Sequence, residues 1–138
     1  MRALFVDTSG WVAVADQSDR VHERAARFYG QAFAHYARLV TTSLILAESY
    51  ALLRRALPTD RVLYWLDRLL ASPRVEVVYD DRALIDRARS LLAAYGDQKF
   101  SLVDGVSFAV MRDRRIREAL AFDRHFQTAG FTLVPRDQ

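Results

Sequence analysis

Short apolar runs that alternate with segments of helical character constrain the fold of this chain more than any other feature. Each run is long enough for one buried strand, and the candidate strands are residues 3–6, 39–42, 75–79, 118–122 and 131–134. The intervening segments have cap residues or apolar spacings of three and four, which predict helices over residues 8–16, 21–37, 43–57, 59–70, 81–96 and 101–114. This alternation predicts an α/β fold, a three-layer α/β/α sandwich on a mostly parallel sheet of four to five strands.

Length and composition are consistent with one compact domain spanning residues 1–138. At 138 residues a sizeable core can be buried, and 51% hydrophobic with 27% charged residues is ordinary for a globular protein. The chain has no cysteine, which excludes disulfides and thiolate chemistry. The apolar run at residues 3–6 is too short for a signal peptide, and the uncharged stretch at 39–47 is too short to span a membrane. We therefore expect a cytoplasmic protein with no membrane partner.

Four acidic side chains stand at the ends of, or inside, the most apolar stretches. They are Asp7, Glu48, Asp104 and Asp123. A buried carboxylate is costly unless a positive charge meets it, and no lysine adjoins any of the four. Ligands of open parallel sheets bind at the carboxyl ends of the strands, where Asp7 and Asp123 are expected. The pattern therefore predicts that the four acids converge on one rim and bind a divalent cation.

Each acid also has a purely structural interpretation. Asp7, or one of the two residues after it, could simply cap a helix, and Glu48 could be an exposed helix residue paired with a nearby arginine. Asp104 has capping-box spacing from the serine three positions before it, and Asp123 could accept backbone hydrogen bonds in a turn. A single His beside a loop, such as His125, is more often neither a base nor a ligand. No glycine-rich phosphate loop or nucleophile elbow accompanies these acids.

The positive charge of the chain is carried almost entirely by arginine. Lys99 is the single lysine among 20 basic residues, the net charge is +3, and the sequence pI is about 9.6. Arginine binds phosphate oxygens in a bidentate manner and stacks on bases, which favours a nucleic-acid partner. A GC-rich genome would produce the same bias, so composition alone does not decide between the two explanations.

Four short segments, in this order and at these separations, resemble the PIN-domain family, and most of all the VapC-type toxins of prokaryotic toxin–antitoxin pairs. The segments are Phe5-Val6-Asp7-Thr8-Ser9, Leu46-Ala47-Glu48, residues 100–109 and residues 121–126, with Gly130-Phe131 behind them. The resemblance covers the whole chain. It implies a PIN-like sandwich and a Mg²⁺- or Mn²⁺-dependent endoribonuclease that hydrolyses RNA phosphodiester bonds with a metal-activated water.

The resemblance also implies roles for individual residues. Asp7 and Asp104 would be the firmest metal ligands, and Asp123 and Glu48 would complete the catalytic site directly or through water. Ser9 and Ser101 would support the ligands. The site could hold one metal or two, and the sequence leaves that choice open. Proteins of this family often pair as homodimers and are silenced by a cognate antitoxin, so RNA, an antitoxin and a second copy are the expected partners.

An acidic pocket repels RNA, so we expect basic residues near it to bind the RNA backbone. The candidates nearest the motifs in sequence are Arg54, Arg55, Arg112, Arg115 and Arg124. Some of them could instead be solvated residues at helix ends. Two other functions stay open at this level: an RNA-processing nuclease that has no antitoxin, and a non-catalytic RNA-binding module.

Overall fold

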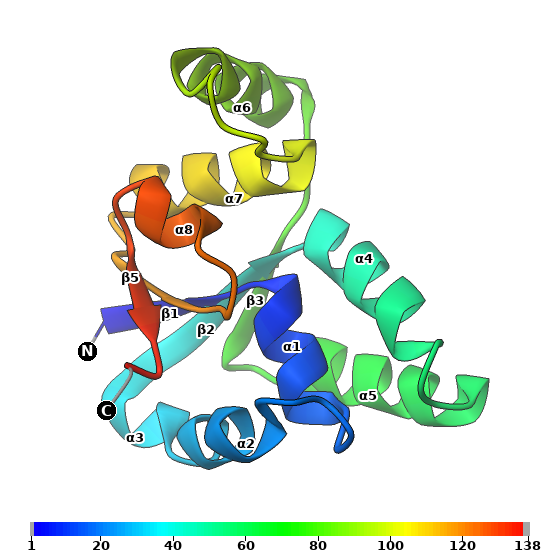
Figure 1. The fold of residues 1–138 in the computed structure, drawn as a ribbon. Helices are drawn as coiled ribbons and strands as arrows, with labels where there is room; N and C mark the ends of the chain where they lie inside the picture. Colours follow the sequence, from blue (N-terminus) through cyan, green and yellow to red (C-terminus); the bar gives the residue numbers. More distant parts are fainter. Residues whose placement is uncertain (1, 137–138) are drawn as a thin grey trace.

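The structure is a computed structural model that describes residues 2–136, and its centre is a five-stranded sheet (Figure 1). The strands are β1 (Arg2–Val6), β2 (Tyr36–Thr42), β3 (Val75–Val78), β4 (Glu118–Leu120) and β5 (Thr132–Val134). They lie in the order β3-β2-β1-β4-β5, and every neighbouring pair is parallel. The order places β1 at the centre and β5 at one edge.

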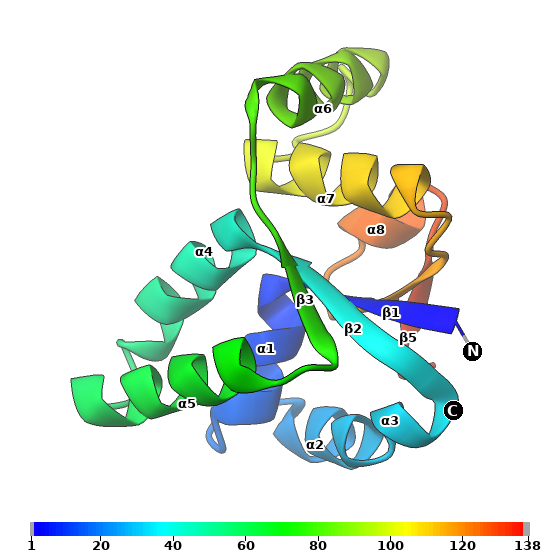
Figure 2. The same cartoon turned by 180° about the vertical axis from the view of Figure 1, so that it is seen from behind.

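Helices cover both faces of the sheet. They are α1 (Thr8–Ala15), α2 (His22–Gly30), α3 (Ala32–His35), α4 (Ser43–Leu53), α5 (Thr59–Ala71), α6 (Arg82–Ala94), α7 (Leu102–Asp113) and α8 (His125–Thr128). Figures 1 and 2 show α6, α7 and α8 on one side of the sheet, and α1, α2, α3 and α5 on the other. Helix α4 packs beside α1. The predicted three-layer α/β/α sandwich on a parallel sheet is confirmed.

Aromatic side chains attach each helical layer to the sheet. Phe5 of β1 contacts Phe126 of α8. Phe126 in turn packs edge-on against Phe108 of α7, with 5.1 Å between the ring centroids. On the opposite face the buried Trp11 of α1 donates a hydrogen bond of 3.1 Å from Nε1 to Oγ1 of Thr41 in β2. The hydrogen bond of Trp11 fixes α1 against the sheet on one face, and the packed phenylalanine rings fix α7 and α8 against it on the other.

The prediction of one helix over residues 21–37 is wrong. Helix α2 ends at Gly30, the short α3 follows, and β2 already begins at Tyr36. Tyr36 pairs with Arg2 of β1, and its hydroxyl donates a hydrogen bond of 3.1 Å to Glu118. Pairing with a strand that is distant in the sequence therefore overrides the helical spacing of this segment.

Two element ends and one short helix also differ from prediction. Helix α4 ends at Leu53 rather than at residue 57, because a turn follows in which the Arg54 guanidinium donates to the carbonyl of Leu57, and Pro58 comes next. Strand β4 stops at Leu120, since the backbone N–H of Phe122 donates to a serine hydroxyl instead of to a strand. The short helix α8 was not predicted.

The start of α1 is pressed against the end of β4. The backbone N–H of Asp7 donates to the carbonyl oxygen of Leu120 at 3.1 Å. A Cβ atom at Gly10 would lie 2.4 Å from the same oxygen, so a side chain there would force the two elements apart. This close approach brings Asp7 and Asp123, which follow different strands, to the same edge of the sheet. Within residues 2–136, no helix is long and apolar enough to cross a membrane.

Candidate active site

The four predicted acids line a single pocket of about 550 Å³ at the carboxyl edge of the sheet. The predicted site residues in its wall are Asp7, Ser9, Glu48, Ser101, Asp104 and Asp123. They come from the segments that follow β1 and β4, from the beginnings of α1 and α7, and, for Glu48, from the middle of α4. The predicted convergence of these side chains on one rim is therefore what the structure has, and this pocket is called the acidic pocket below.

Asp7 is the most perturbed of these acids. It caps α1, is 4% exposed, and its carboxylate accepts hydrogen bonds from the backbone N–H and the hydroxyl of Ser9 at 3.4 and 3.0 Å. Burial, and then the negative charge of Asp123, raise the pKa of Asp7 to about 7, although the hydrogen bonds from Thr8 and Ser9 oppose the rise. The structural interpretation of Asp7 as an N-cap is confirmed, and Asp7 also lines the acidic pocket, while its role as a metal ligand stays a prediction.

Ser9 has two partners and therefore a fixed orientation. Its hydroxyl donates to Asp7 and accepts a hydrogen bond of 2.9 Å from the backbone N–H of Phe122. The serine thus connects the end of β1 to the segment that carries Asp123.

Asp104 stands at the third position of α7 in a complete capping box. The hydroxyl of Ser101 accepts from the backbone N–H of Asp104, and the Asp104 carboxylate accepts from the backbone N–H of Ser101, both at 3.0 Å. Asp104 is 7% exposed, and its Oδ2 also lies 2.8 Å from Nδ1 of His125. His125 therefore contacts a predicted ligand, a contact that its position beside a loop did not reveal.

Glu48 and Asp123 are less enclosed. The hydroxyl of Thr8 donates to Glu48 at 2.5 Å, and the Asp123 carboxylate accepts a hydrogen bond of 3.1 Å from the backbone N–H of His125. Asp123 is half-buried and Glu48 is exposed. The expectation that all four acids are carried into apolar surroundings is thus wrong for Glu48, which projects from the helix surface into the open side of the acidic pocket.

The chemistry of the donor set fits a hard divalent cation. Carboxylate and hydroxyl oxygens line the acidic pocket, and a cation would favour the ionised form of Asp7, whose pKa is raised by burial and then by the charge of Asp123. In the part of the chain that the structure describes, no three acidic or histidine side chains are arranged to hold an ion as they stand.

The acidic pocket also contains residues that the sequence analysis did not select. They are Val12, Asp19, Arg20, Val21, Leu52, Lys99 and Phe122. Asp19 is a fifth acid, and its carboxylate accepts from the backbone N–H of Val21 at 3.0 Å. No lysine adjoins the four acids in sequence, but Lys99, in the segment between α6 and α7, lines the pocket with them. Its position five residues before Asp104 was the signal in the sequence that could have identified Lys99 as a residue of the pocket.

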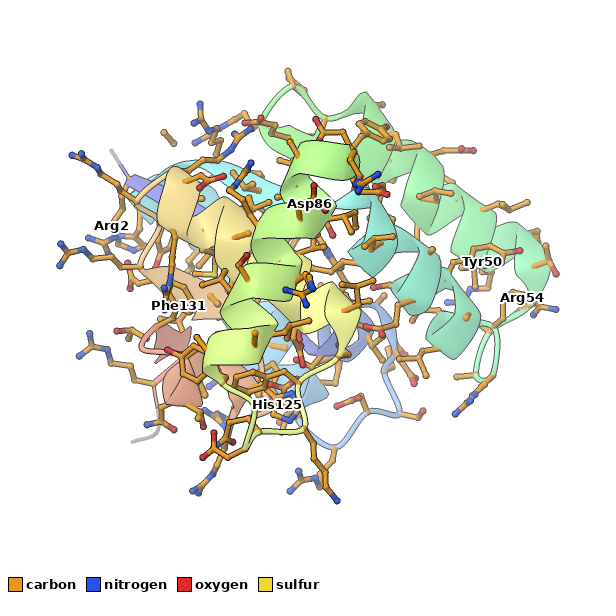
Figure 3. The ribbon with its side chains drawn as sticks, turned by 90° about the horizontal axis from the view of Figure 1, so that it is seen from above. Arg2, Tyr50, Arg54, Asp86, His125 and Phe131 are labelled. Atoms are coloured by element: carbon orange, nitrogen blue, oxygen red, sulfur yellow. The ribbon has the colours of Figure 1, made fainter. Side chains whose placement is uncertain are left out.

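The five arginines predicted to bind RNA do not form one surface. Arg124 and Arg115 line two different depressions, and Arg112 donates to the hydroxyl of Tyr95 at 3.2 Å. Arg54 and Arg55 follow the end of α4. Figure 3 shows Arg54 on the opposite side of the molecule from Phe131, which lines the same depression as Arg124.

Comparison with known proteins gives consistent results. The sequence profile of the PIN domain matches residues 4–132. The 23S rRNA-specific endonuclease VapC20 of Mycobacterium tuberculosis, found in strains CDC 1551 and H37Rv, is 36% identical over 132 residues. That alignment covers 95% of this chain and 97% of the relative.

Solved structures show the same architecture. The crystal structure of M. tuberculosis VapC20, described as a sarcin-ricin loop cleaving toxin, has a TM-score of 0.84 and 32% identity, and covers 94% of this chain and 96% of that one. FitAcB from Neisseria gonorrhoeae has a TM-score of 0.65 at 16% identity, covering 94% and 95%. VapBC2 from Rickettsia felis, bound to a DNA fragment from its promoter, has a TM-score of 0.63 at 13% identity, covering 95% and 96%. The last two similarities concern the fold alone.

Proposed function

The chain belongs to the PIN-domain family and to its VapC-type branch of ribonuclease toxins, and from that premise we propose that it cleaves 23S ribosomal RNA in the acidic pocket with the aid of Mg²⁺ or Mn²⁺. The single observation that carries the proposal is the convergence of Asp7, Glu48, Asp104 and Asp123 on one pocket. The substrate is proposed by analogy with VapC20, since the two sequences align over almost their whole lengths. The sarcin-ricin loop is the first target to test.

We assign Asp7 and Asp104 as metal ligands, with Asp123 and Glu48 completing the set directly or through water. A bound Mg²⁺ or Mn²⁺ supplies Lewis-acid chemistry, lowering the pKa of a water and offsetting charge on the phosphate. The protein's own task is to hold the carboxylates in place. The Ser9 hydroxyl orients Asp7, and the capping box with Ser101 orients Asp104.

His125 and Thr8 are assigned positioning roles. His125 lies against Oδ2 of Asp104, and Thr8 donates to Glu48, so each restricts the rotation of one carboxylate. Restricting rotation in advance reduces the entropy lost when the carboxylates bind a common ion. Neither residue is assigned contact with the reacting atoms.

Partners and compartment are proposed on the same analogy. A toxin that cuts ribosomal RNA needs an inhibitor, so we expect a cognate antitoxin, and the reaction is placed in the cytoplasm, where ribosomes are. The exposed apolar side chains Leu63, Tyr64 and Leu70 of α5 are a candidate surface for such a partner. The homodimer stays a prediction that analytical ultracentrifugation of the purified protein would test.

The test is cleavage of an RNA stem-loop with the sarcin-ricin sequence, in the presence of Mg²⁺ or Mn²⁺ and with EDTA as a blank. We expect the wild type to cut and the variants Asp7→Asn and Asp104→Asn to lose cleavage by at least about a hundredfold, because each removes a charge from the proposed metal site. Asp67→Asn is the matched control, since Asp67 is exposed on α5 and lies outside the acidic pocket.

Two outcomes would count against the proposal. If Asp7→Asn and Asp104→Asn cut as fast as the wild type, the site is assigned to the wrong residues. If the wild type binds the RNA but cuts neither it nor other structured RNA with either cation, the chain is a binding module rather than a nuclease.

A further inference from the structure

A depression lined by arginines adjoins the acidic pocket. It has a volume of about 810 Å³ and lies between the start of α2, the helix α8 and the edge strand β5. Its basic residues are Arg20, Arg24, Arg124 and Arg136, and no acidic residue among residues 2–136 lines it. We call it the arginine depression. It shares Arg20, Val21 and Phe122 with the acidic pocket, so the two hollows adjoin at these residues.

The positive charge of the arginine depression is largely uncompensated. Within the described chain, the side chains of Arg20, Arg124 and Arg136 make no ion pair with any Asp or Glu, and all three are exposed. Exposed arginines that are not paired with a carboxylate are the groups that phosphate binds in a bidentate manner. Arg24 is held in place, with its guanidinium 5.8 Å from the centre of the Phe122 ring.

A second arginine-rich hollow, of about 740 Å³ at the amino edge of the sheet, is the weaker candidate. Arg2 there pairs with Glu118 at 2.6 Å, and Arg114 pairs with Glu76 at 2.5 Å. Much of its charge is therefore already neutralised by the protein. It also shares no residue with the acidic pocket.

We propose that the arginine depression binds the phosphate backbone of the RNA strand beside the cleaved bond, and that Phe122 receives a base at the junction with the acidic pocket. The inference rests on the proposed ribonuclease function. A strand whose phosphate enters the acidic pocket must leave it on some side, and on this side Arg20, Arg124 and Arg136 are exposed and have no acidic partner among residues 2–136. Phe122 is half-buried at the junction, and its aromatic ring supplies a surface on which a base can stack. This ring favours RNA over an acidic protein segment, which has no base to stack.

The location differs from the one expected from the sequence. Of the five arginines predicted to bind RNA, only Arg124 lines the arginine depression. Figure 3 shows Phe131, which also lines it, on the far side of the molecule from Arg54. The depression thus selects one direction along which the RNA strand leaves the acidic pocket.

The test is the affinity of a short single-stranded RNA, measured by fluorescence anisotropy over a range of salt concentrations. Every protein carries Asp7→Asn, so that binding is read without cleavage. Arg124→Gln with Arg136→Gln should weaken binding and reduce the slope of log Kd against log salt by about 1.4, since each phosphate contact to a single strand contributes about 0.7. Arg61→Gln with Arg89→Gln removes the same charge from α5 and α6, outside the arginine depression, and should leave the slope unchanged.

A third variant separates stacking from charge. Phe122→Leu should weaken RNA binding about tenfold with no change in the salt slope, because stacking releases no counterions. In the cleavage-competent protein, the arginine pair should raise KM and leave kcat unchanged, since these residues bind the strand and do not touch the reacting phosphate.

The outcomes separate this inference from the proposed function. If the two arginine pairs lower RNA affinity equally, the depression is not the RNA site. The same holds if Arg136→Gln alone accounts for the whole loss and Arg124→Gln alone has no effect, because Arg136 also lines the second hollow whereas Arg124 lines only the arginine depression. In that case wild-type cleavage that Asp7→Asn abolishes would leave the nuclease function intact. If the protein neither binds nor cuts RNA, both proposals fail together.

Discussion

The substitution Asp7→Asn tests whether the carboxyl group of Asp7 destabilises the metal-free protein when it ionises. In the folded protein the pKa of Asp7 rises from 3.8 to about 7, mainly through burial and then through the charge of Asp123. The folded state therefore keeps a proton that the unfolded state has lost between pH 3.8 and 7. Because stability falls with rising pH wherever the folded state binds more protons, the metal-free protein should lose stability across this window.

The magnitude follows from the same two values. One pKa unit corresponds to about 1.4 kcal/mol. The raised pKa of Asp7 therefore lowers the free energy of unfolding by about 4 kcal/mol at pH 8 and by about 1.7 kcal/mol at pH 5, relative to a side chain that is neutral in both states. Asn is neutral at both pH values and has a similar shape. The advantage of Asp7→Asn over the wild type should therefore grow by about 2.5 kcal/mol between pH 5 and pH 8.

The assay is urea unfolding in EDTA at pH 5 and pH 8, with Asp67→Asn as a control for removing an exposed carboxylate. If Asp7→Asn changes the unfolding free energy by the same amount at both pH values, the Asp7 carboxyl is not held neutral in the fold. The account of charge repulsion in the acidic pocket would then be wrong, even if the variant failed to cut RNA.

Three further measurements test other parts of the structure. Mn²⁺ at a hundred times its Kd should stabilise the wild type by about 2.7 kcal/mol, an effect seen as a higher Tm that Asp104→Asn should abolish; an equal rise in both proteins would place the ion elsewhere. Thr41→Val should cost about 1–3 kcal/mol in chemical unfolding, because it leaves the buried indole N–H of Trp11 without its acceptor, and a neutral result would mean that water replaces it. Gly10→Ala should lower Tm, since its Cβ would meet a backbone oxygen at 2.4 Å, whereas Gly30→Ala meets no atom within 4 Å and should be neutral or stabilising; similar Tm values for the two variants would contradict the close contact of α1 with β4.

The layered fold could be predicted because a strand that is buried on both faces is a continuous run of apolar residues in the sequence. Residues 3–6 are such a run and form β1, whereas residues 75–78, which contain Glu76, were predicted from their β-branched valines and form β3. The segment around Tyr36 could not be predicted in this way. Its residues have helical spacing, and only their pairing with β1 makes them a strand, so the deciding interaction lies with residues distant in the sequence.

The acids could be predicted for a related reason. Asp7 and Asp123 each follow an apolar run, and parallel strands bring their carboxyl ends to one edge. The burial of Glu48 was overestimated, because apolar neighbours on a helix do not show which side faces another element. The contact of His125 with Asp104 depends on the turn that begins α8, a short element without a clear sequence signal.

The arginines were the least predictable part of the site. Clustering in sequence drew attention to residues 112–117, whereas the arginine depression combines Arg20 and Arg24 from one end of the chain with Arg136 from the other. The sheet order brings these segments together by placing β5 at the edge beside α2. Proximity in the chain is therefore a poor guide to a surface that is assembled from opposite termini.

The separation of charge between the two hollows has a consequence for catalysis. Carboxylates in the acidic pocket repel phosphate, and at physiological salt this repulsion extends only about 8 Å into solvent. Arg20, Arg124 and Arg136 pair with no carboxylate among residues 2–136, so they can bind neighbouring phosphates without neutralising the carboxylates that bind the cation. Binding energy gained in the arginine depression would then offset the cost of bringing one phosphate among the acids. Salt should consequently raise KM much more than it lowers kcat, and a salt effect confined to kcat would contradict this division of roles between the two hollows.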